Sequence, residues 1–468
     1  MKEYLWNEEL IKHVTGAEIY GKFSGTTICI DSRKAKPGCI FVAFKGTKVD
    51  GHEYVAEAFA KGASAAIVEH IPNNTSIDRT KLALVKNSEK AIEDLADFNR
   101  NTCKAKIIAV TGSVGKTSTK EALTIAFKAL GKTHCSEGNY NNKLGMSISL
   151  ASMPKNTEFA IYELGMDHAG EIEVLTKTLK PDAAIITTIA PVHLEHFNSV
   201  EGIARAKAEI FLGMKSDSYV ILNGDNEYYD LLKELAEKQK IKNITSFGEK
   251  PQNDSFLINY KREGTISHIS ASIIGQRLDY EIAAYGKHQA INTVAVLAVI
   301  KSMSLDLKKA SESLKEFNNV KGRGKISSII FDNKKLLLID DSYNASPKSV
   351  NAALASIKDI CAGSPSVERR IAILADMYEL GDDSISMHKG LLPVIEKSGI
   401  DKVITVGDLM KNLFDVLPNN LKLAHFNDFR SAINHVCSHV NDNDCILVKG
   451  SFGTKIHELA NYLLEEKK

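Results

Sequence analysis

A glycine-rich turn at residues 111–118 has the composition of a phosphate-binding loop. It reads Thr-Gly-Ser-Val-Gly-Lys-Thr-Ser and follows the apolar, β-branched run 107–110. Backbone N–H groups converge in such a turn between a strand and a helix, and the helix dipole favours a bound anion. Lys116 can contact a terminal phosphate, and the hydroxyl of Thr117 can bind Mg²⁺. The standard spacing G-x-x-x-x-G-K-[ST] would place a glycine where Val110 stands, so the turn is a shorter variant.

Polar side chains also stand where two further predicted strands end. We expect strands at residues 159–163 and 183–189, and α/β sheets bind ligands at the carboxyl ends of their strands. Glu163 and His193 fall at these ends, and either could ligate the Mg²⁺ that accompanies nucleotide phosphates. A zinc site at His193 and His196 is not favoured, because their spacing matches no standard zinc pattern and no cysteine is nearby.

Lys207 interrupts the apolar stripe of the helix predicted over residues 201–214. By helical spacing that stripe consists of Ile203, Ala206, Ile210 and Met214. The first interpretation is a lysine whose apolar stem is buried while its ammonium group reaches water. The second is a desolvated lysine with a lowered pKa, which can be modified or act at a site. The spacing alone does not decide between them.

Two groups of polar loops are candidates for substrate contact. Residues 136–145 carry three asparagines between two glycines, which predicts a turn and favours contact with a substrate. Nearer the N-terminus, polar loops at 31–38 and 45–52 follow short predicted strands. Arg33 in the first of these loops could pair with a phosphate or a carboxylate, although ordinary turns are the alternative.

The order of predicted elements divides the chain into three α/β domains. Residues 1–104 form a small N-terminal substrate domain, 105–318 a central P-loop ATPase-type parallel sheet, and 319–468 a C-terminal Rossmann-like domain. Outside the strands already named, we expect strands at 27–30, 39–44, 65–68, 326–331, 335–339, 371–374, 402–406 and 445–448. We expect helices at 54–62, 89–100 and 117–130, and a further helix after Gly286.

Bulk composition excludes several function classes. The 468 residues carry 25% charged side chains and a formal net charge of +1, which gives no support for a nucleic-acid or polybasic membrane partner. The seven scattered cysteines predict reduced thiols instead of a disulfide framework. No uninterrupted apolar run approaches 18 residues, and the N-terminus lacks the apolar region of a signal peptide. We therefore expect a cytoplasmic protein, and a monomer.

Several strings in a fixed order resemble the Mur ligase family over the whole length of the chain. They are Thr-Gly-Ser-Val-Gly-Lys-Thr at 111–117, Gly-Asn-Tyr-Asn-Asn at 138–142, Glu-Leu-Gly at 163–165, His-Leu-Glu at 193–195, Arg-Ala-Lys-Ala-Glu-Ile at 205–210, Gly-Lys-His-Gln-Ala-Ile-Asn at 286–292, Gly-Arg at 322–323, Asp-Asp-Ser-Tyr-Asn-Ala-Ser-Pro at 340–347 and Asp-Met-Tyr-Glu-Leu-Gly at 376–381.

The resemblance implies an ATP-dependent amide ligase of peptidoglycan precursor synthesis. Its expected substrates are UDP-N-acetylmuramoyl-tripeptide and D-alanyl-D-alanine, with ATP and Mg²⁺ as cofactors. A carboxylate would attack the γ-phosphate of ATP to give an acyl phosphate, which the amine then attacks. Such a step needs positioning and clamping by cations. The alternatives are a sister ligase that adds another amino acid and a P-loop regulatory ATPase.

The resemblance also implies roles for individual residues. Lys116, Glu163, His193 and Lys207 are the expected catalytic residues, and Thr117, Glu163, His193 and a carbamylated Lys207 the expected metal ligands. The expected ATP-binding residues are Thr111, Gly112, Ser113, Val114, Gly115, Lys116, Thr117, Ser118, Asn292, Arg323, Asp340 and Asn344. The expected substrate residues are Ser32, Arg33, Lys45, Gly46, Asn141, Asn142 and His288.

Overall fold

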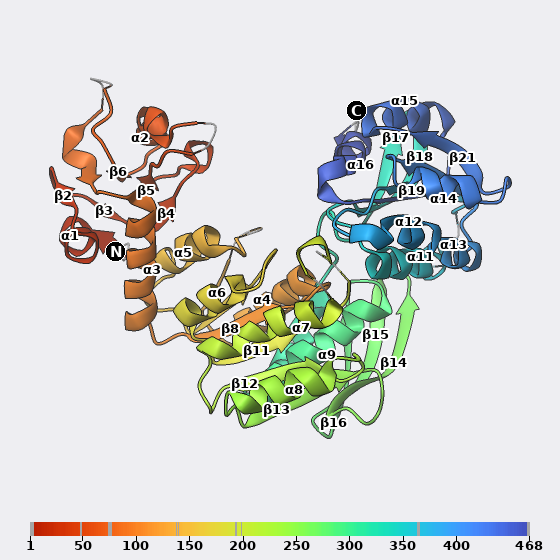
Figure 1. The fold of residues 1–468 in the computed structure, drawn as a ribbon, viewed down its shortest axis with the longest axis horizontal. Helices are drawn as coiled ribbons and strands as arrows, with labels where there is room; N and C mark the ends of the chain where they lie inside the picture. The colour runs from red at the N-terminus through yellow and green to blue at the C-terminus, as the bar shows by residue number, and fades with distance from the viewer. Residues whose placement is uncertain are drawn as a thin grey trace.

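Three α/β units, each built around its own sheet, make up the chain (Figure 1). The computed structural model describes residues 4–46, 49–73, 77–136, 138, 140–191, 194–197, 199–362 and 366–465. In Figure 1 the N-terminal unit lies at the left, the central unit below, and the C-terminal unit at the upper right. The domain limits at 104/105 and 318/319 stay a prediction, and they fall between the last strand of one sheet and the first strand of the next.

The N-terminal unit contains a five-stranded sheet in the order β2-β7-β6-β5-β4, parallel except for β2, and a small β1–β3 pair. Its strands are β1 (Trp6–Asn7), β2 (Glu18–Ile19), β3 (Ser24–Gly25), β4 (Thr27–Cys29), β5 (Cys39–Val42), β6 (Ala65–Val68) and β7 (Leu82–Leu84). Its helices are α1 (Glu8–Thr15), α2 (Val55–Ala60) and α3 (Ser88–Thr102), with 3₁₀ turns η1 (Ser32–Lys34), η2 (Gly51–Tyr54) and η3 (Arg79–Lys81).

The central unit contains a nine-stranded sheet in the order β16-β15-β14-β13-β12-β11-β8-β10-β9. Its strands are β8 (Lys106–Thr111), β9 (Thr133–Cys135), β10 (Phe159–Glu163), β11 (Ala183–Ile186), β12 (Tyr219–Asn223), β13 (Asn243–Gly248), β14 (Ser255–Glu263), β15 (Ile266–Ile273) and β16 (Gln276–Ile282). Its helices are α4 (Lys116–Leu130), α5 (Lys143–Ala151), α6 (Glu171–Leu179), α7 (Val200–Ala208), α8 (Tyr229–Lys238), α9 (Lys287–Ser302) and α10 (Leu307–Ser313), with 3₁₀ turns η4 (Leu194–His196), η5 (Glu209–Gly213) and η6 (Leu314–Glu316). The strands β8 to β14 pair in parallel, whereas β14, β15 and β16 pair antiparallel.

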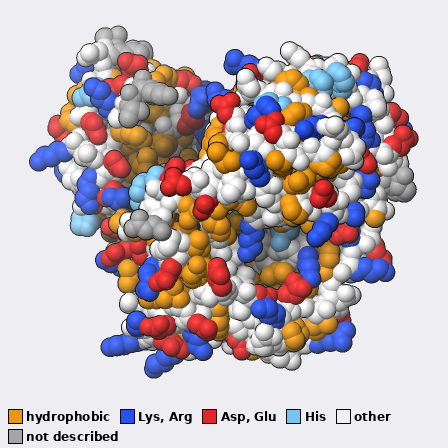
Figure 2. Space-filling model, turned by 45° about the vertical axis from the view of Figure 1, so that its right-hand side comes forward, with side chains coloured by type: hydrophobic (Ala, Val, Ile, Leu, Met, Phe, Trp, Pro, Cys, Tyr) orange, Lys and Arg blue, Asp and Glu red, His pale blue; other side chains and the backbone are white. Residues whose placement is uncertain are grey.

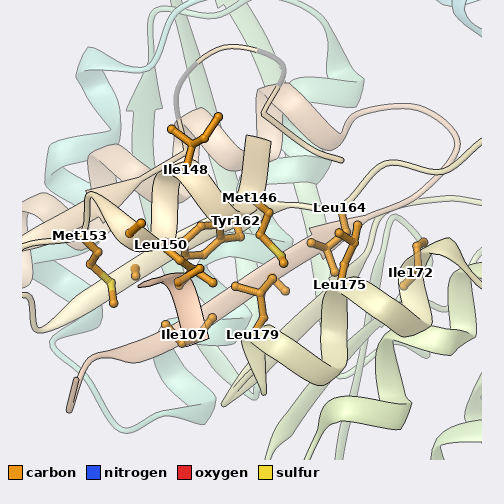
Figure 3. Close-up of a cluster of buried hydrophobic side chains, with 14 of the residues drawn as sticks. Ile107, Met146, Ile148, Leu150, Met153, Tyr162, Leu164, Ile172, Leu175 and Leu179 are labelled. Atoms are coloured by element: carbon orange, nitrogen blue, oxygen red, sulfur yellow. The ribbon is translucent and has the colours of Figure 1, made fainter. Parts of the chain in front are cut away.

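Both faces of the central sheet are covered, because the strand side chains alternate between two separate cores. In β8, Ile107 and Ala109 enter one core, while Ile108 and Val110 enter the other. The helices α5, α6, α7 and α8 contribute to the first core, and α4, α9 and α10 to the second. Figure 3 shows the first core, with side chains of α5 and α6 lying over Ile107 and over Tyr162 of β10.

The C-terminal unit contains a six-stranded sheet in the order β17-β18-β22-β19-β20-β21, parallel except for the β17–β18 hairpin. Its strands are β17 (Lys325–Phe331), β18 (Lys334–Asp341), β19 (Arg369–Ala375), β20 (Lys402–Val406), β21 (Lys422–Phe426) and β22 (Asp444–Lys449). Its helices are α11 (Pro347–Ala362), α12 (Ser384–Lys389), α13 (Leu392–Ser398), α14 (Lys411–Val416), α15 (Phe429–His439) and α16 (Ile456–Glu465), with 3₁₀ turns η7 (Gly381–Asp383) and η8 (Phe452–Thr454).

The expected α/β fold class is confirmed, and two local predictions are wrong. The helix predicted over 201–214 ends as α7 at Ala208 and continues as the tighter turn η5. The reason is close packing on α6: the hydroxyl of Thr176 donates to the Ile210 carbonyl at 2.7 Å, and a Cβ on Gly213 would lie 2.0 Å from the Thr176 carbonyl oxygen. The strand predicted over 183–189 already ends at Ile186.

The N-terminal and central units share one continuous hydrophobic core, whereas the C-terminal sheet has its own two cores. The indole Nε1 of Trp6 donates to the Ala151 carbonyl at 2.7 Å. The amide Nδ2 of Asn99 on α3 donates to the carbonyls of Leu150 and Met153 at 2.7 and 2.8 Å. These bonds attach the N-terminal unit to the end of α5. The first two units therefore form one packed body.

The surface agrees with the balanced composition. Basic and acidic side chains are interspersed over the face shown in Figure 2, without a large patch of one sign. Of the helices in the described part of the chain, none is long and apolar enough to cross a bilayer.

Removal of the Asn99 side-chain hydrogen bonds should lower the stability of the body formed by the first two units. Asn99→Ala leaves the Met153 carbonyl without its donor and removes one of the bonds to the Leu150 carbonyl, which keeps the Met153 N–H. We therefore expect the free energy of unfolding of the shared body to fall by about 1–3 kcal/mol. Trp6 is the only tryptophan in the sequence and lies in this interface, so its fluorescence during urea unfolding measures the change. Asp97→Ala on the same helix is the control, because Asp97 is exposed. Equal stability of the two variants would contradict the prediction.

Candidate active site

The turn between β8 and α4 has the geometry of an anion-binding loop. Gly112 and Gly115 adopt φ angles of +145° and +91°, where a side chain would strain the backbone. A Cβ on Gly112 would also lie 2.0 Å from Oγ1 of Thr187. Helix α4 begins directly at Lys116, so its free N–H groups face the turn. The loop thus fits phosphate groups, as the sequence predicts.

Thr187, which the sequence analysis did not identify, fixes this loop from the neighbouring strand. Its hydroxyl lies 2.6 Å from the carbonyl oxygen of Val114 and 3.3 Å from that of Thr111. The side chain of Thr111 itself is fully buried and donates to the Leu164 carbonyl at 2.9 Å, so it ties β8 to the end of β10. The only sequence signal for Thr187 was its place near the end of an apolar strand.

Glu163, at the end of β10, faces the first turn of α4. The Thr117 hydroxyl donates to Oε2 of Glu163 at 2.8 Å, and the carboxylate is only 3% exposed. A hydroxyl oxygen and a carboxylate oxygen this close are the ligand types that Mg²⁺ prefers, so this pair fits the ion. Lys116 Nζ donates to the Gly112 carbonyl at 2.8 Å. Burial lowers the pKa of Lys116, and the neighbouring Glu163 partly offsets that effect.

Lys207 is buried, with 1% exposure, so the interpretation in which its ammonium group reaches water is wrong. Within the described residues, no carboxylate lies within ion-pair distance of its Nζ. Burial lowers the pKa of Lys207 well below the usual value, and the charge of Lys116 lowers it further. Lys207 therefore feels the charge of the P-loop lysine and tends toward the neutral amine. His193, the other predicted ligand, lies outside the described residues.

The asparagine loop reaches the same carboxylate from the other side. Nδ2 of Asn141 lies 3.4 Å from Oε1 of Glu163, and the Asn141 carbonyl accepts the Gly165 N–H at 2.9 Å. Oδ1 of Asn142 caps α5 by accepting the Gly145 N–H at 2.9 Å. The structure therefore brings the predicted substrate loop next to the predicted metal ligands. Substrate contact by Asn141 and Asn142 stays a prediction.

Two of the predicted ATP-binding residues face the P-loop from other elements. Asn292 of α9 lies over Gly115, since a Cβ at that glycine would be 3.4 Å from its amide group. The guanidinium of Arg323 stacks 4.2 Å above the Tyr343 ring, and its charge acts on Lys116. Arg323 precedes β17, so the C-terminal unit presents a cation to the loop.

Asp340 and Asn344 stand at the end of β18 and have structural partners of their own. Asp340 is 3% exposed, and its carboxylate accepts the Gly322 N–H at 2.9 Å and the Ser342 hydroxyl at 2.5 Å. It therefore shapes the loop that carries Arg323, while the ribose contact implied by the resemblance stays a prediction. Asn344 is exposed, and its carbonyl accepts Lys449 Nζ at 3.1 Å. Lys449 is buried and also pairs with Asp341 at 2.7 Å.

The remaining predicted residues are distributed over two units. Near the loop, the Ser113 hydroxyl donates to the Ala190 carbonyl at 3.0 Å, the Ser118 hydroxyl faces Gln289, and His288 is exposed beside Gly286. In the N-terminal unit, the Ser32 hydroxyl donates to Glu57, Arg33 is exposed and paired with Asp31, and Lys45 and Gly46 are exposed. No described contact links these last four residues to the P-loop.

A group of metal-ligand types in the N-terminal unit has another explanation. Asp50, His52 and His70 offer ligand atoms within 4.8 Å of one another. However, Nδ1 of His52 lies 2.6 Å from the Asp50 carboxylate, and Nε2 accepts the Glu69 N–H at 2.8 Å. Both ring nitrogens are thus engaged within the protein, and the cluster fixes the loop after β5 instead of binding an ion.

Comparisons with known proteins agree with this geometry in all three units. The Mur ligase family catalytic domain matches residues 26–106, the Mur ligase middle domain residues 110–300, and the Mur ligase glutamate ligase domain residues 328–452. The UDP-N-acetylmuramoyl-tripeptide–D-alanyl-D-alanine ligase of Rickettsia prowazekii is 38% identical, over 98% of this chain and 99% of that protein.

Solved structures share the fold over nearly the full length. A crystal structure of MurF from Acinetobacter baumannii has a TM-score of 0.80 and 27% identity, covering 98% of this chain and 99% of its own. MurF ligase from Thermotoga maritima in complex with ADP has a TM-score of 0.74 and 24% identity, covering 94% and 97%, and shows the fold alone. With the P-loop, the buried Glu163 and the full-length matches, the chain belongs to the Mur ligase family.

Proposed function

We propose that this protein is an ATP-dependent ligase that joins D-alanyl-D-alanine to the terminal carboxylate of UDP-N-acetylmuramoyl-tripeptide. The relatives matched over nearly the whole chain support this choice among the Mur ligases. The observation that carries the proposal is Lys207, which is buried near a P-loop with a lowered pKa. A regulatory P-loop ATPase has no need for a buried amine whose pKa is lowered by the P-loop lysine, whereas a ligase must neutralise a carboxylate and a triphosphate together.

Cationic residues of the chain would contact the phosphates, and oxygen ligands would hold the metal ion. Lys116 and the N–H groups of the loop hold the β- and γ-phosphates, and Arg323 supplies a second cation from the C-terminal unit. Thr117 and Glu163 would hold one Mg²⁺, which when bound neutralises phosphate charge. A neutral Lys207 can react with CO₂ to form a carbamate, because its lone pair is free. The carbamate would be a second, carboxylate-like ligand in an apolar helix.

Binding of the substrates involves all three units. Ser32, Arg33, Lys45 and Gly46 offer polar groups for the UDP portion, and Asn141 and Asn142 for the muramoyl-peptide. The N-terminal and central units share a core, so they would hold this substrate as one body. The C-terminal unit brings Arg323 and the strand ends of β18 and β22, and its approach would exclude water from the acyl phosphate. His288 lies on α9 toward the same side as Lys449.

Phosphate release from ATP tests the activity directly. We expect release to require both UDP-N-acetylmuramoyl-tripeptide and an amine, with D-alanyl-D-alanine preferred over single amino acids. The measurement is phosphate production with each amine in turn, together with mass spectrometry of the peptide product. Release that is independent of the muramoyl substrate would support a regulatory ATPase, and preference for a single amino acid would support a sister ligase.

Substitution of Glu163 should change the Mg²⁺ concentration that the enzyme requires. Glu163→Gln removes the charge of a ligand, so we expect the Mg²⁺ concentration for half-maximal activity to rise at least about tenfold. Titration of activity with Mg²⁺ at saturating ATP measures this shift. Glu234→Gln serves as the control, since Glu234 is an exposed residue of α8. An unchanged Mg²⁺ midpoint would remove Glu163 from the ligand set.

If Lys207 acts as a carbamate, its replacement should lower kcat, and an arginine at this position should not restore the activity. We expect Lys207→Ala and Lys207→Arg to reduce kcat by about a hundredfold or more, because neither can carry a carbamate. Steady-state ligase assays measure the loss, and Lys215→Ala, at an exposed position just beyond η5, is the control. If the arginine variant keeps the activity, Lys207 acts as a cation and the carbamate is wrong.

A further inference from the structure

Lys120 is a second fully buried lysine close to the P-loop, and the ligase chemistry described above does not use it. It lies one helical turn beyond Lys116 on α4 and is 1% exposed. Its Nζ donates to the carbonyl oxygens of Ser136 and Gly138, both at 3.2 Å. The nearest described carboxylate is that of Glu121, 3.6 Å away. Burying an ammonium group destabilises the fold unless its N–H groups are hydrogen-bonded. Here two of them donate hydrogen bonds to backbone carbonyls.

These two carbonyls belong to the segment that leads from β9 into the asparagine loop. The other end of the loop is fixed by different partners: the Asn141 carbonyl accepts the Gly165 N–H, and Asn142 caps α5. The loop is therefore held between α4 on one side and β10 and α5 on the other. Lys120 supplies the only side-chain hydrogen bonds from α4 to the described part of this loop.

We infer that Lys120 is a positioning residue that couples the nucleotide-binding helix to the muramoyl-peptide loop. By holding the carbonyls of Ser136 and Gly138, it sets where Asn141 meets Glu163, which in turn bonds Thr117 at the start of α4. These contacts form a closed ring of interactions that runs from α4 to the asparagine loop, from the loop to Glu163, and from Glu163 back to α4. The inference rests on the proposed function, because it assumes that Asn141 and Asn142 contact the substrate.

Hydrogen bonding, and not volume, explains why a lysine stands at this position. Two of its neighbours on the buried face of α4, Leu123 and Phe127, are apolar, so the long apolar side chain of a methionine can replace the lysine stem there. Loop carbonyls without a strand partner need donors, and a charged donor makes the stronger bond. The long lysine side chain also spans from the helix to the loop, which a shorter donor would do only in part.

Kinetics of Lys120→Met separate positioning from general stability. We expect the KM for UDP-N-acetylmuramoyl-tripeptide to rise about tenfold or more, the effect of losing a charge-assisted hydrogen bond, while the KM for ATP stays within about threefold. Lys120→Gln keeps N–H donors on a shorter side chain and should give an intermediate KM. Lys128→Met, at an exposed position of the same helix, should match the wild type. Equal changes in both KM values, or none, would overturn the inference.

Hydrogen exchange without substrates gives a second result that does not depend on the activity. The N–H groups of Gly145 and Gly165 bond to the asparagine loop, so we expect them to exchange about tenfold faster in Lys120→Met. The Thr119 N–H, bonded within α4 to Gly115, should not change. If Lys120→Met fails to fold, Lys120→Gln takes its place in both measurements. An inactive wild type would refute the proposed function, and unaltered exchange would refute the role of Lys120.

Discussion

A buried carboxylate at the end of β10 is the interaction on which the site depends. One oxygen of Glu163 accepts the Thr117 hydroxyl of the P-loop helix, and the other faces Asn141 of the asparagine loop. A carboxylate that is 3% exposed must be paired, so both neighbours are held to it. The strand is parallel to β8 and ends beside it, which follows from the pairing of Glu163 with Val110. The sheet register thus brings the two loops to one anion.

The cores divide the molecule into a packed body and a more independent unit. The N-terminal and central units are joined by the buried bonds of Trp6 and Asn99, so they form one packed body. The C-terminal unit contacts the central unit through both apolar and polar groups, and Tyr285 of the central unit packs in a core of the C-terminal sheet. The Leu194 N–H donates to the Glu379 carbonyl at 3.0 Å, and Lys348 Nζ donates to the Thr188 hydroxyl at 3.0 Å.

The periodicity of the sequence predicted the architecture better than it predicted the details of the site. Strand β10 is found at the predicted residues 159–163, because its run is apolar, short and bounded by polar residues. The β14–β16 extension was missed, although β15 alternates polar and apolar residues with the period of a strand, so a signal for it was present in the sequence. Lys207 was noticed because a charge interrupts an apolar stripe. Thr187 and Lys120 were missed, since their roles depend on partners distant in the sequence, which no local pattern contains.

Three buried lysines, Lys120, Lys207 and Lys449, differ in the partners of their amino groups. Lys449 has an acid partner in Asp341, so its charge is balanced within the C-terminal unit. Lys120 donates hydrogen bonds to two backbone carbonyls, so its ammonium group holds the asparagine loop in place. Lys207 has no acid within ion-pair distance in the described structure, and burial therefore shifts it toward the neutral form. The ammonium groups of the first two lysines thus have hydrogen-bond acceptors within the protein. Lys207, the lysine without such a partner, is the one that tends toward the neutral amine, and the charge of Lys116 in the P-loop adds to that effect.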